Sequence, residues 1–84
     1  SKLSQLQILN LAFNQVESFV ELEQIELPSL RELNISWNQF EVFPNEIRQW
    51  KSLTTLDLSF NKLKSLPPFA LVGLDELTWL SLAS

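Results

Sequence analysis

The sequence repeats one apolar frame at intervals of 23 or 24 residues. Each copy opens with a leucine, places a second apolar residue three positions later and a third two positions after that. The opening leucines are Leu6, Leu30, Leu53 and Leu77. A period of this length is typical of stacked units, because one unit can bury its apolar edge only against a neighbour. We therefore expect a solenoid with repeats near 6–29, 30–52 and 53–76 and a partial repeat at 77–84.

The frame reads LxxLxLxxNxLxxL, and two copies continue with a proline, at Pro44 and Pro67. It resembles the leucine-rich-repeat family along essentially the whole chain. VFPNEIRQW, with Ile47, is similar to the 23-residue repeats of Ras-pathway scaffolds, whereas SLPPFALVGL is similar to the 24-residue repeats of receptor ectodomains. The resemblance implies an α/β fold class, a solenoid with a curved parallel β-sheet on the concave side and irregular or short helical returns on the convex side.

The residues agree with this architecture. Apolar and polar residues alternate in the LxL part of each frame, which predicts one short strand with one buried face per repeat. The repeated asparagines Asn14, Asn38 and Asn61 are expected to be structural, because a carboxamide can satisfy backbone donors and acceptors where the chain leaves a strand. The expected core column consists of Phe19, Phe43 and Leu66.

Few residue types that support catalysis occur in this chain. It contains no His and no Cys, and Gly73 is its one glycine. This composition excludes His-based triads, thiol catalysis, zinc sites of the Cys or His type and glycine-rich phosphate loops. We interpret Glu17, Glu21, Glu23 and Glu26 in the first return as a solvated acidic face rather than a cation site. The chain is therefore not expected to be an enzyme or to hold a metal or a cofactor.

The charge and hydropathy of the chain limit its partners and its location. Six basic and ten acidic residues give a net charge of −4, so no nucleic-acid partner is expected. No stretch approaches the roughly 20 apolar residues that span a bilayer, so no membrane insertion is expected. The absence of cysteine favours a reducing compartment and predicts a cytoplasmic location, with an extracellular ectodomain as the alternative. Asn34, Ile35 and Ser36 form an N-glycosylation sequon, which we interpret as a chance match.

Partner contact is expected on the concave face, where the polar strand positions point away from the buried leucines. The predicted protein-binding residues are Ile8, Asn10, Phe13, Glu32, Asn34, Trp37, Thr55, Asp57, Phe60, Trp79 and Ser81. A further column is expected beside them at Ala12, Ser36, Ser59 and Ala83. Two alternatives stay open: Phe13, Trp37 and Phe60 stack on one another at the sheet edge, and Trp79 packs on a continuation of the array.

These features predict a non-catalytic protein–protein interaction module, a scaffold or recognition segment of a larger signalling protein. Its expected partners are a protein bound on the concave face and flanking repeats of the same array, because the apolar frame is interrupted at Leu3 and at Ser84. One alternative is a spacer solenoid within a large assembly. The other is the ligand-binding part of a receptor ectodomain.

Overall fold

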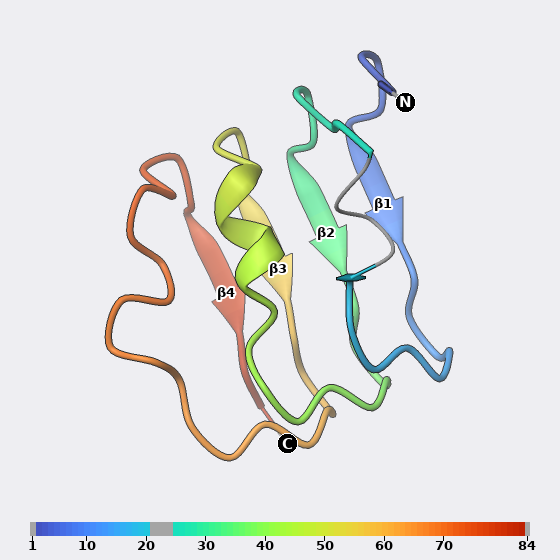
Figure 1. Ribbon diagram of the computed structural model, residues 1–84, viewed down its shortest axis with the longest axis vertical. Helices are drawn as coiled ribbons and strands as arrows, with labels where there is room; N and C mark the ends of the chain where they lie inside the picture. The colour runs from blue at the N-terminus through green and yellow to red at the C-terminus, as the bar shows by residue number, and fades with distance from the viewer. Residues whose placement is uncertain (1, 21–24, 84) are drawn as a thin grey trace.

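The computed structural model describes residues 2–20 and 25–83, whose four short strands form one parallel sheet in chain order (Figure 1). The strands are β1 (Ile8–Asn10), β2 (Glu32–Asn34), β3 (Thr55–Asp57) and β4 (Trp79–Ser81). The second apolar residue of each frame pairs with its counterpart, Leu9 with Leu33, Leu33 with Leu56 and Leu56 with Leu80. The period therefore sets the register, and the prediction of one strand per repeat is confirmed.

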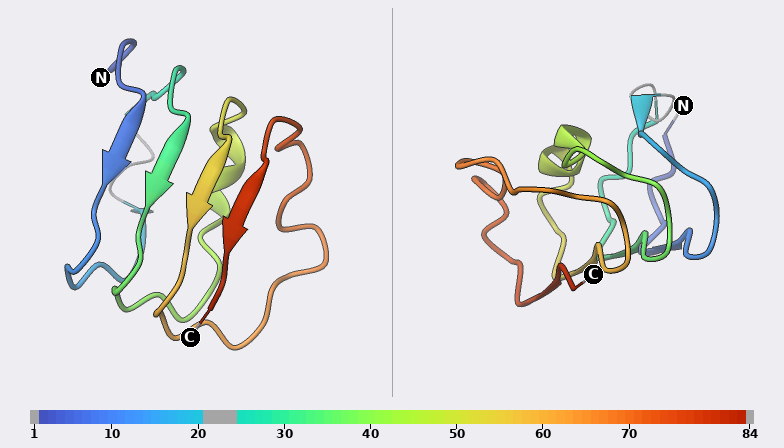
Figure 2. Two further views of the ribbon diagram at one scale, coloured as in Figure 1. Left: turned by 180° about the vertical axis from the view of Figure 1, so that it is seen from behind. Right: turned by 90° about the horizontal axis from the view of Figure 1, so that it is seen from below.

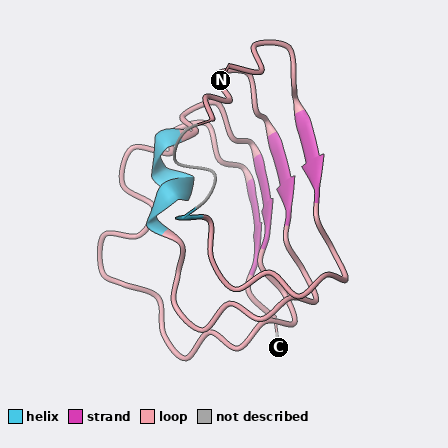
Figure 3. Ribbon diagram, turned by 45° about the vertical axis from the view of Figure 1, so that its right-hand side comes forward, coloured by secondary structure: helices cyan, strands magenta, loops and turns pink. Residues whose placement is uncertain are grey.

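The segments between the strands form a second layer on one side of the sheet (Figures 2 and 3). The 3₁₀ helix η2 (Asn45–Gln49) follows Pro44, whose extended backbone ends the preceding segment. Ile47 of this helix is fully buried. The return between β3 and β4 consists of turns and irregular backbone. The expectation of irregular or short helical returns is therefore confirmed.

The leucine frame forms the core between the two layers. In the central strands, Leu33 and Leu56 are fully buried, as is Leu58 directly after β3. Their counterparts Leu9 and Leu80 are only partly buried, because β1 and β4 are the edges of the sheet. Since the stability of stacked repeats comes from the interfaces between neighbours, the two central repeats hold most of the core.

Aromatic side chains fill the core beneath the first two returns. The ring centroid of Phe19 lies 5.0 Å from that of Phe40. The expected core column is confirmed for Phe19 and Phe43, which are buried, but it is wrong for Leu66, which is 40% exposed. In the described part of the chain, no further return packs over Leu66, and the segment after it buries Ala70 instead.

The repeated asparagines join neighbouring repeats. Nδ2 of Asn38 donates to the carbonyl oxygen of Leu11 in the previous repeat at 2.9 Å and to that of Ile35 in its own repeat at 3.0 Å. Its Oδ1 accepts a hydrogen bond from the backbone N–H of Val16 at 3.0 Å. Asn61 makes the equivalent bonds one repeat further along the chain. The predicted structural role of the asparagines is therefore confirmed.

Candidate binding surface

The sheet face that is turned away from the returns, called the concave face below, has a hollow of about 170 Å³ at its middle. Seven of the predicted binding residues line this hollow, together with Leu9 and Leu33 of the frame. The seven are Ile8, Asn10, Glu32, Asn34, Thr55, Asp57 and Trp79. The structure thus brings most of the predicted surface together around one hollow, while Ser81, Phe13, Trp37 and Phe60 lie outside its lining.

The parallel register places one row of residues at the starts of the strands, in the order Ile8, Glu32, Thr55 and Trp79. Ile8 is 60% exposed and Trp79 is 50% exposed. Between them, Glu32 is exposed and Thr55 is half-buried. The row therefore offers a large apolar side chain at each end and polar groups in between, which is a combination that protein partners can use.

The next row contains Asn10, Asn34 and Asp57, which are the last residues of β1, β2 and β3. Oδ1 of each accepts a hydrogen bond from the backbone N–H two residues later, at 3.0, 2.9 and 3.0 Å respectively. In these Asx turns, the Oδ1 atom of each side chain holds the backbone turn in place. Nδ2 of Asn34 and Oδ2 of Asp57 make no hydrogen bond to the described residues, so both stay available on the concave face.

The expected third column does not lie open on this face. Ser36 and Ser59 are buried, and their hydroxyls donate to Oδ1 of Asn34 and of Asp57. The prediction of exposed serines was wrong because each Asx turn draws the serine back toward the preceding side chain. Ala83 is exposed as expected.

Three aromatic residues form a stack along the edge where the strands end, called the aromatic ladder below. The rings of Phe13 and Trp37 are 5.5 Å apart and those of Trp37 and Phe60 are 4.1 Å apart, with 9° between the planes in both pairs. All three residues have a positive φ, at 61°, 57° and 56°, which is a backbone region that residues other than glycine rarely adopt. The stacking proposed as an alternative from the sequence is present, and contact with a partner stays a prediction.

Charge is unevenly distributed between the strands and the rest of the chain. All six basic residues lie outside the strands, at Lys2, Arg31, Arg48, Lys51, Lys62 and Lys64. The charged residues that line the hollow are Glu32 and Asp57. Because no basic side chain lines the hollow beside them, their negative charge is uncompensated there.

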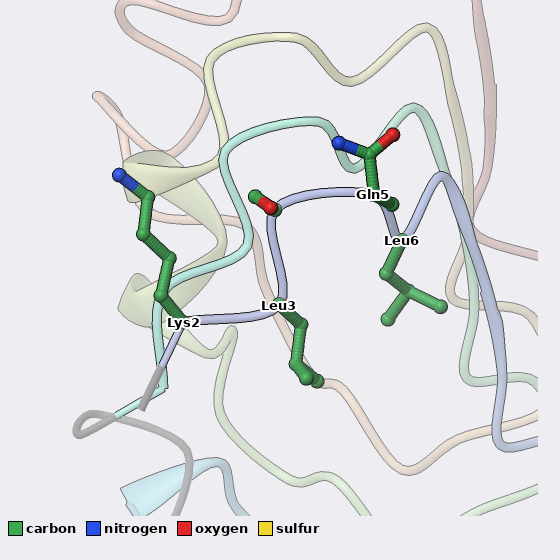
Figure 4. Close-up of a pocket in the computed structure, with 5 residues that line it drawn as sticks. Lys2, Leu3, Gln5 and Leu6 are labelled. Carbon is green, nitrogen blue, oxygen red and sulfur yellow. The ribbon is translucent and has the colours of Figure 1, made fainter.

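A larger hollow of about 490 Å³ lies at the first end of the stack, between residues 2 and 6 (Figure 4). Leu3 and Leu6 point to one side of this segment, and Lys2 and Gln5 point to the other (Figure 4). The counterparts of the two leucines in the next repeat, Leu27 and Leu30, are buried in the core. Leu3 and Leu6 thus occupy frame positions that are buried one repeat further along the chain.

Residues 2–20 and 25–83 show little evidence of other kinds of site. No group of three or more His, Cys, Asp or Glu residues that could hold a metal ion occurs there. Of the acidic residues in the first return, Glu17 and Glu26 are exposed, whereas Glu21 and Glu23 lie outside the described residues. No described helix is long and apolar enough to cross a membrane. The concave face has the clearest features of a binding surface in this part of the chain.

Two features of this surface were not predicted from the sequence. The Asx turns follow a recurring pair, an Asn or Asp with Ala or Ser two positions later, which is visible at 10–12, 34–36 and 57–59. The positive φ values fall on the aromatic residue that precedes each repeated asparagine. Asn and Asp in such spacing would have indicated the turns, whereas nothing in the aromatic residues themselves indicates a left-handed backbone.

Comparisons with known proteins agree with the repeat architecture. A family model described as "Leucine rich repeat" matches residues 41–84, and a second model, "Leucine Rich Repeat", matches residues 29–50. The chain is 34% identical over 77 residues to "Toll-like receptor 8" of Homo sapiens, covering 82% of this chain and 7% of that protein. It is 44% identical over 57 residues to "Tsukushi" of Mus musculus, covering 68% of this chain and 16% of that protein. No solved structure is significantly similar to it.

The chain spans only a small part of the length of these two relatives. One of them is a receptor by name, so the comparisons support the receptor alternative better than the predicted cytoplasmic scaffold. The first family model covers more than half of the chain, and its match includes β3 and β4. The chain belongs to the leucine-rich repeat family.

Proposed function

We propose that the chain is a non-catalytic protein-interaction segment of a larger leucine-rich-repeat protein, and that it binds a protein partner through the concave face. The observation that carries this proposal is the row of strand residues beside the hollow. Ile8 and Trp79, both at least half exposed, stand at the ends of this row. Tryptophan is enriched among the residues that dominate binding energy at protein interfaces.

The polar groups of the concave face suit the surroundings of such a contact. Thr55, Asn34 and Asp57 line the hollow, and a partner can pair with the Thr55 hydroxyl, Nδ2 of Asn34 and Oδ2 of Asp57 as it covers Trp79. The stacked rings of the aromatic ladder extend the contact area along the edge where the strands end. An interface of this kind combines an aromatic anchor with a rim of hydrogen-bonding groups.

We further propose a receptor-type, extracellular setting for the segment, supported by the similarity to the human receptor. Flanking repeats are proposed to cover Leu3 and Leu6 at one end of the sheet and Leu82 at the other, in the way that neighbours cover Leu30 and Leu53. A cytoplasmic scaffold and a spacer with an unused concave face are the competing functions.

Site-specific photo-crosslinking tests the proposal. A benzoylphenylalanine is placed at Ile8, which is 60% exposed on the concave face, and, as the matched control, at Val42, which is 72% exposed in the return between β2 and β3. The chain is then irradiated with cell-surface and secreted proteins, and separately with cytosolic proteins. We expect crosslinks from Ile8 to proteins of the first pool, and we expect the added change Trp79→Ala to reduce them. Equal crosslinking from Val42 would contradict concave binding, and crosslinks confined to cytosolic proteins would contradict the receptor-type setting.

A further inference from the structure

We propose that the protein partner recognised on the concave face inserts an arginine side chain into the hollow between Glu32, Asp57 and Trp79. This inference rests on the proposed function, because it names the group by which the partner is recognised. It is carried by the charge of the hollow, by its size and by the spacing of the residues that line it.

The charge of the hollow favours a cation. Glu32 and Asp57 line it, and all six basic residues of the chain lie outside the strands. Asp57 is held in place because its Oδ1 accepts hydrogen bonds from the backbone N–H of Ser59 at 3.0 Å and from the Ser59 hydroxyl. Its Oδ2 makes no hydrogen bond to the described residues and can accept one from a partner. A cationic side chain would thus meet two carboxylates that the chain itself leaves uncompensated.

The size of the hollow suits a single side chain and is too small for a drug-sized molecule. Its volume of about 170 Å³ is well below the roughly 300 to 1,000 Å³ that is typical of small-molecule sites. A side chain carried by a protein partner needs only such a shallow recess, since the rest of the interface supplies the remaining contact area.

The spacing of the lining residues favours arginine over lysine. Glu32 and Trp79 lie in one row with Thr55 between them, so their backbones are separated by about 10 Å, twice the distance between adjacent strands. A guanidinium placed over Thr55 can donate two hydrogen bonds to a carboxylate and lie on the face of an indole ring. A lysine ammonium supplies the charge without the planar stacking or the paired donors.

The proposal is tested by NMR titration of the ¹⁵N-labelled chain with N-acetyl-arginine amide. The neutral isostere N-acetyl-citrulline amide is the matched control ligand. We expect the arginine compound to shift the indole N–H signal of Trp79 and the backbone signals of Thr55 and Asp57, and the citrulline compound to leave them in place. The Trp79 indole signal is identified by its loss in Trp79→Phe. Equal shifts with both compounds, or shifts confined to other residues, would overturn the proposal.

Charge variants give a second readout. Glu32→Gln should weaken binding of the arginine compound about two- to fivefold, the size expected for one exposed ion pair. The matched control is Glu41→Gln, which removes an exposed carboxylate that does not line the hollow and should leave the affinity unchanged. Both changes replace exposed side chains, so both variants should melt at the temperature of the parent chain. Equal affinity of the parent chain and Glu32→Gln would refute the assignment of Glu32.

The crosslinking and titration experiments can fail separately. Crosslinking from Ile8 without any specific effect of the arginine compound would leave concave binding standing and refute the arginine anchor. If crosslinks from Ile8 succeed, the crosslinked partner segment should contain an arginine, and replacing that arginine by glutamine should reduce the crosslink. An undiminished crosslink after that replacement would also refute the anchor.

Discussion

Replacing Asn38 by alanine should destabilise the chain strongly, because this side chain links two repeats. Asn38 is 3% exposed and lies between the first and second repeats. Its Nδ2 donates to the carbonyl oxygens of Leu11, Ile35 and Ser36 at 2.9, 3.0 and 3.1 Å. Its Oδ1 accepts from the N–H of Val16 at 3.0 Å. Alanine removes all of these bonds and leaves the backbone groups without their partner.

The expected loss follows from counting these bonds. An amide nitrogen carries two hydrogens, so the three Nδ2 contacts amount to about two full hydrogen bonds. With the bond to Val16 the total is about three, each contributing about 1 kcal/mol of net stability. A loss of about 3 kcal/mol is large for a domain of this size, whose stability is expected to be about 4 to 13 kcal/mol. The melting temperature should then fall by about 12 to 24 °C.

Asn14→Ala is the matched control, because the same residue type occupies the same position of the preceding repeat. Asn14 is exposed, and in the described part of the chain its Nδ2 donates only to the nearby carbonyl oxygens of Leu11 and Ala12. Its loss should cost about 1 kcal/mol or less. Asn38→Asp is the second comparison: it keeps the acceptor but places a carboxylate against carbonyl oxygens, and should destabilise at least as much as alanine.

The assay is urea unfolding of each variant followed by circular dichroism, with thermal melting as a check. A loss below about 1 kcal/mol for Asn38→Ala would refute the assignment of these bonds as a main link between repeats. Equal losses for Asn38→Ala and Asn14→Ala would show that the bonds across the repeat boundary contribute nothing beyond the local ones.

Three further predictions concern the aromatic ladder, the single glycine and the binding surface. Trp37→Ala should lower the free energy of unfolding through the loss of two stacking contacts. Trp37→Gly should be more stable than Trp37→Ala by about 1 kcal/mol, because glycine adopts the φ of 57° without strain. Equal unfolding free energies of the two variants would contradict this. Gly73→Ala should lower the free energy of unfolding by about 1 to 2 kcal/mol in urea, since Gly73 has a φ of 90°. Lys51 Nζ lies 2.7 Å from the new Cβ position, but adding Lys51→Ala should not restore the lost stability, because the backbone strain remains. Trp79→Ala should weaken partner binding by about 2 kcal/mol, measured by calorimetry, with little change in melting temperature.

The repeat period predicted the architecture because it determines which leucines can be buried beside one another. A leucine frame that recurs every 23 or 24 residues can be buried in only one way, with Leu33 beside Leu56 and their strands in register. The asparagines were predictable for a related reason, since a carboxamide at the end of each strand has a definite backbone requirement. Both predictions depend on residues whose environment is set by their own repeat and its neighbour.

The departures arise where that environment changes. Leu66 has the same place in the pattern as the buried Phe43, yet it is exposed, because burial at this position needs a further return to pack over it. Ser36 and Ser59 follow the strand alternation in sequence but turn inward to bond the side chain two residues before them. Alternation predicts which face a side chain occupies only while the backbone is extended, and it fails at the first turn.

The sequon at Asn34 gives an independent test of concave binding. Oδ1 of Asn34 accepts hydrogen bonds from the N–H and hydroxyl of Ser36 at 2.9 and 2.7 Å, whereas Nδ2, the atom that would carry a glycan, makes no bond to the described residues. A glycan is therefore compatible with the turn, but it would fill the hollow that Asn34 lines. If the concave face binds a partner, we expect the chain secreted from mammalian cells to carry no glycan at Asn34.

Gel mobility before and after peptide-N-glycosidase treatment measures this directly, with Asn34→Gln as the reference for the unmodified chain. Glu76→Asn is the positive control, because it completes a sequon with Thr78 at an exposed position outside the hollow and should produce a glycosylated chain. A mobility shift that disappears in Asn34→Gln would show that a glycan occupies the concave face. Protein contact would then have to be sought elsewhere, and the exposed rings of the aromatic ladder would be the first surface to test.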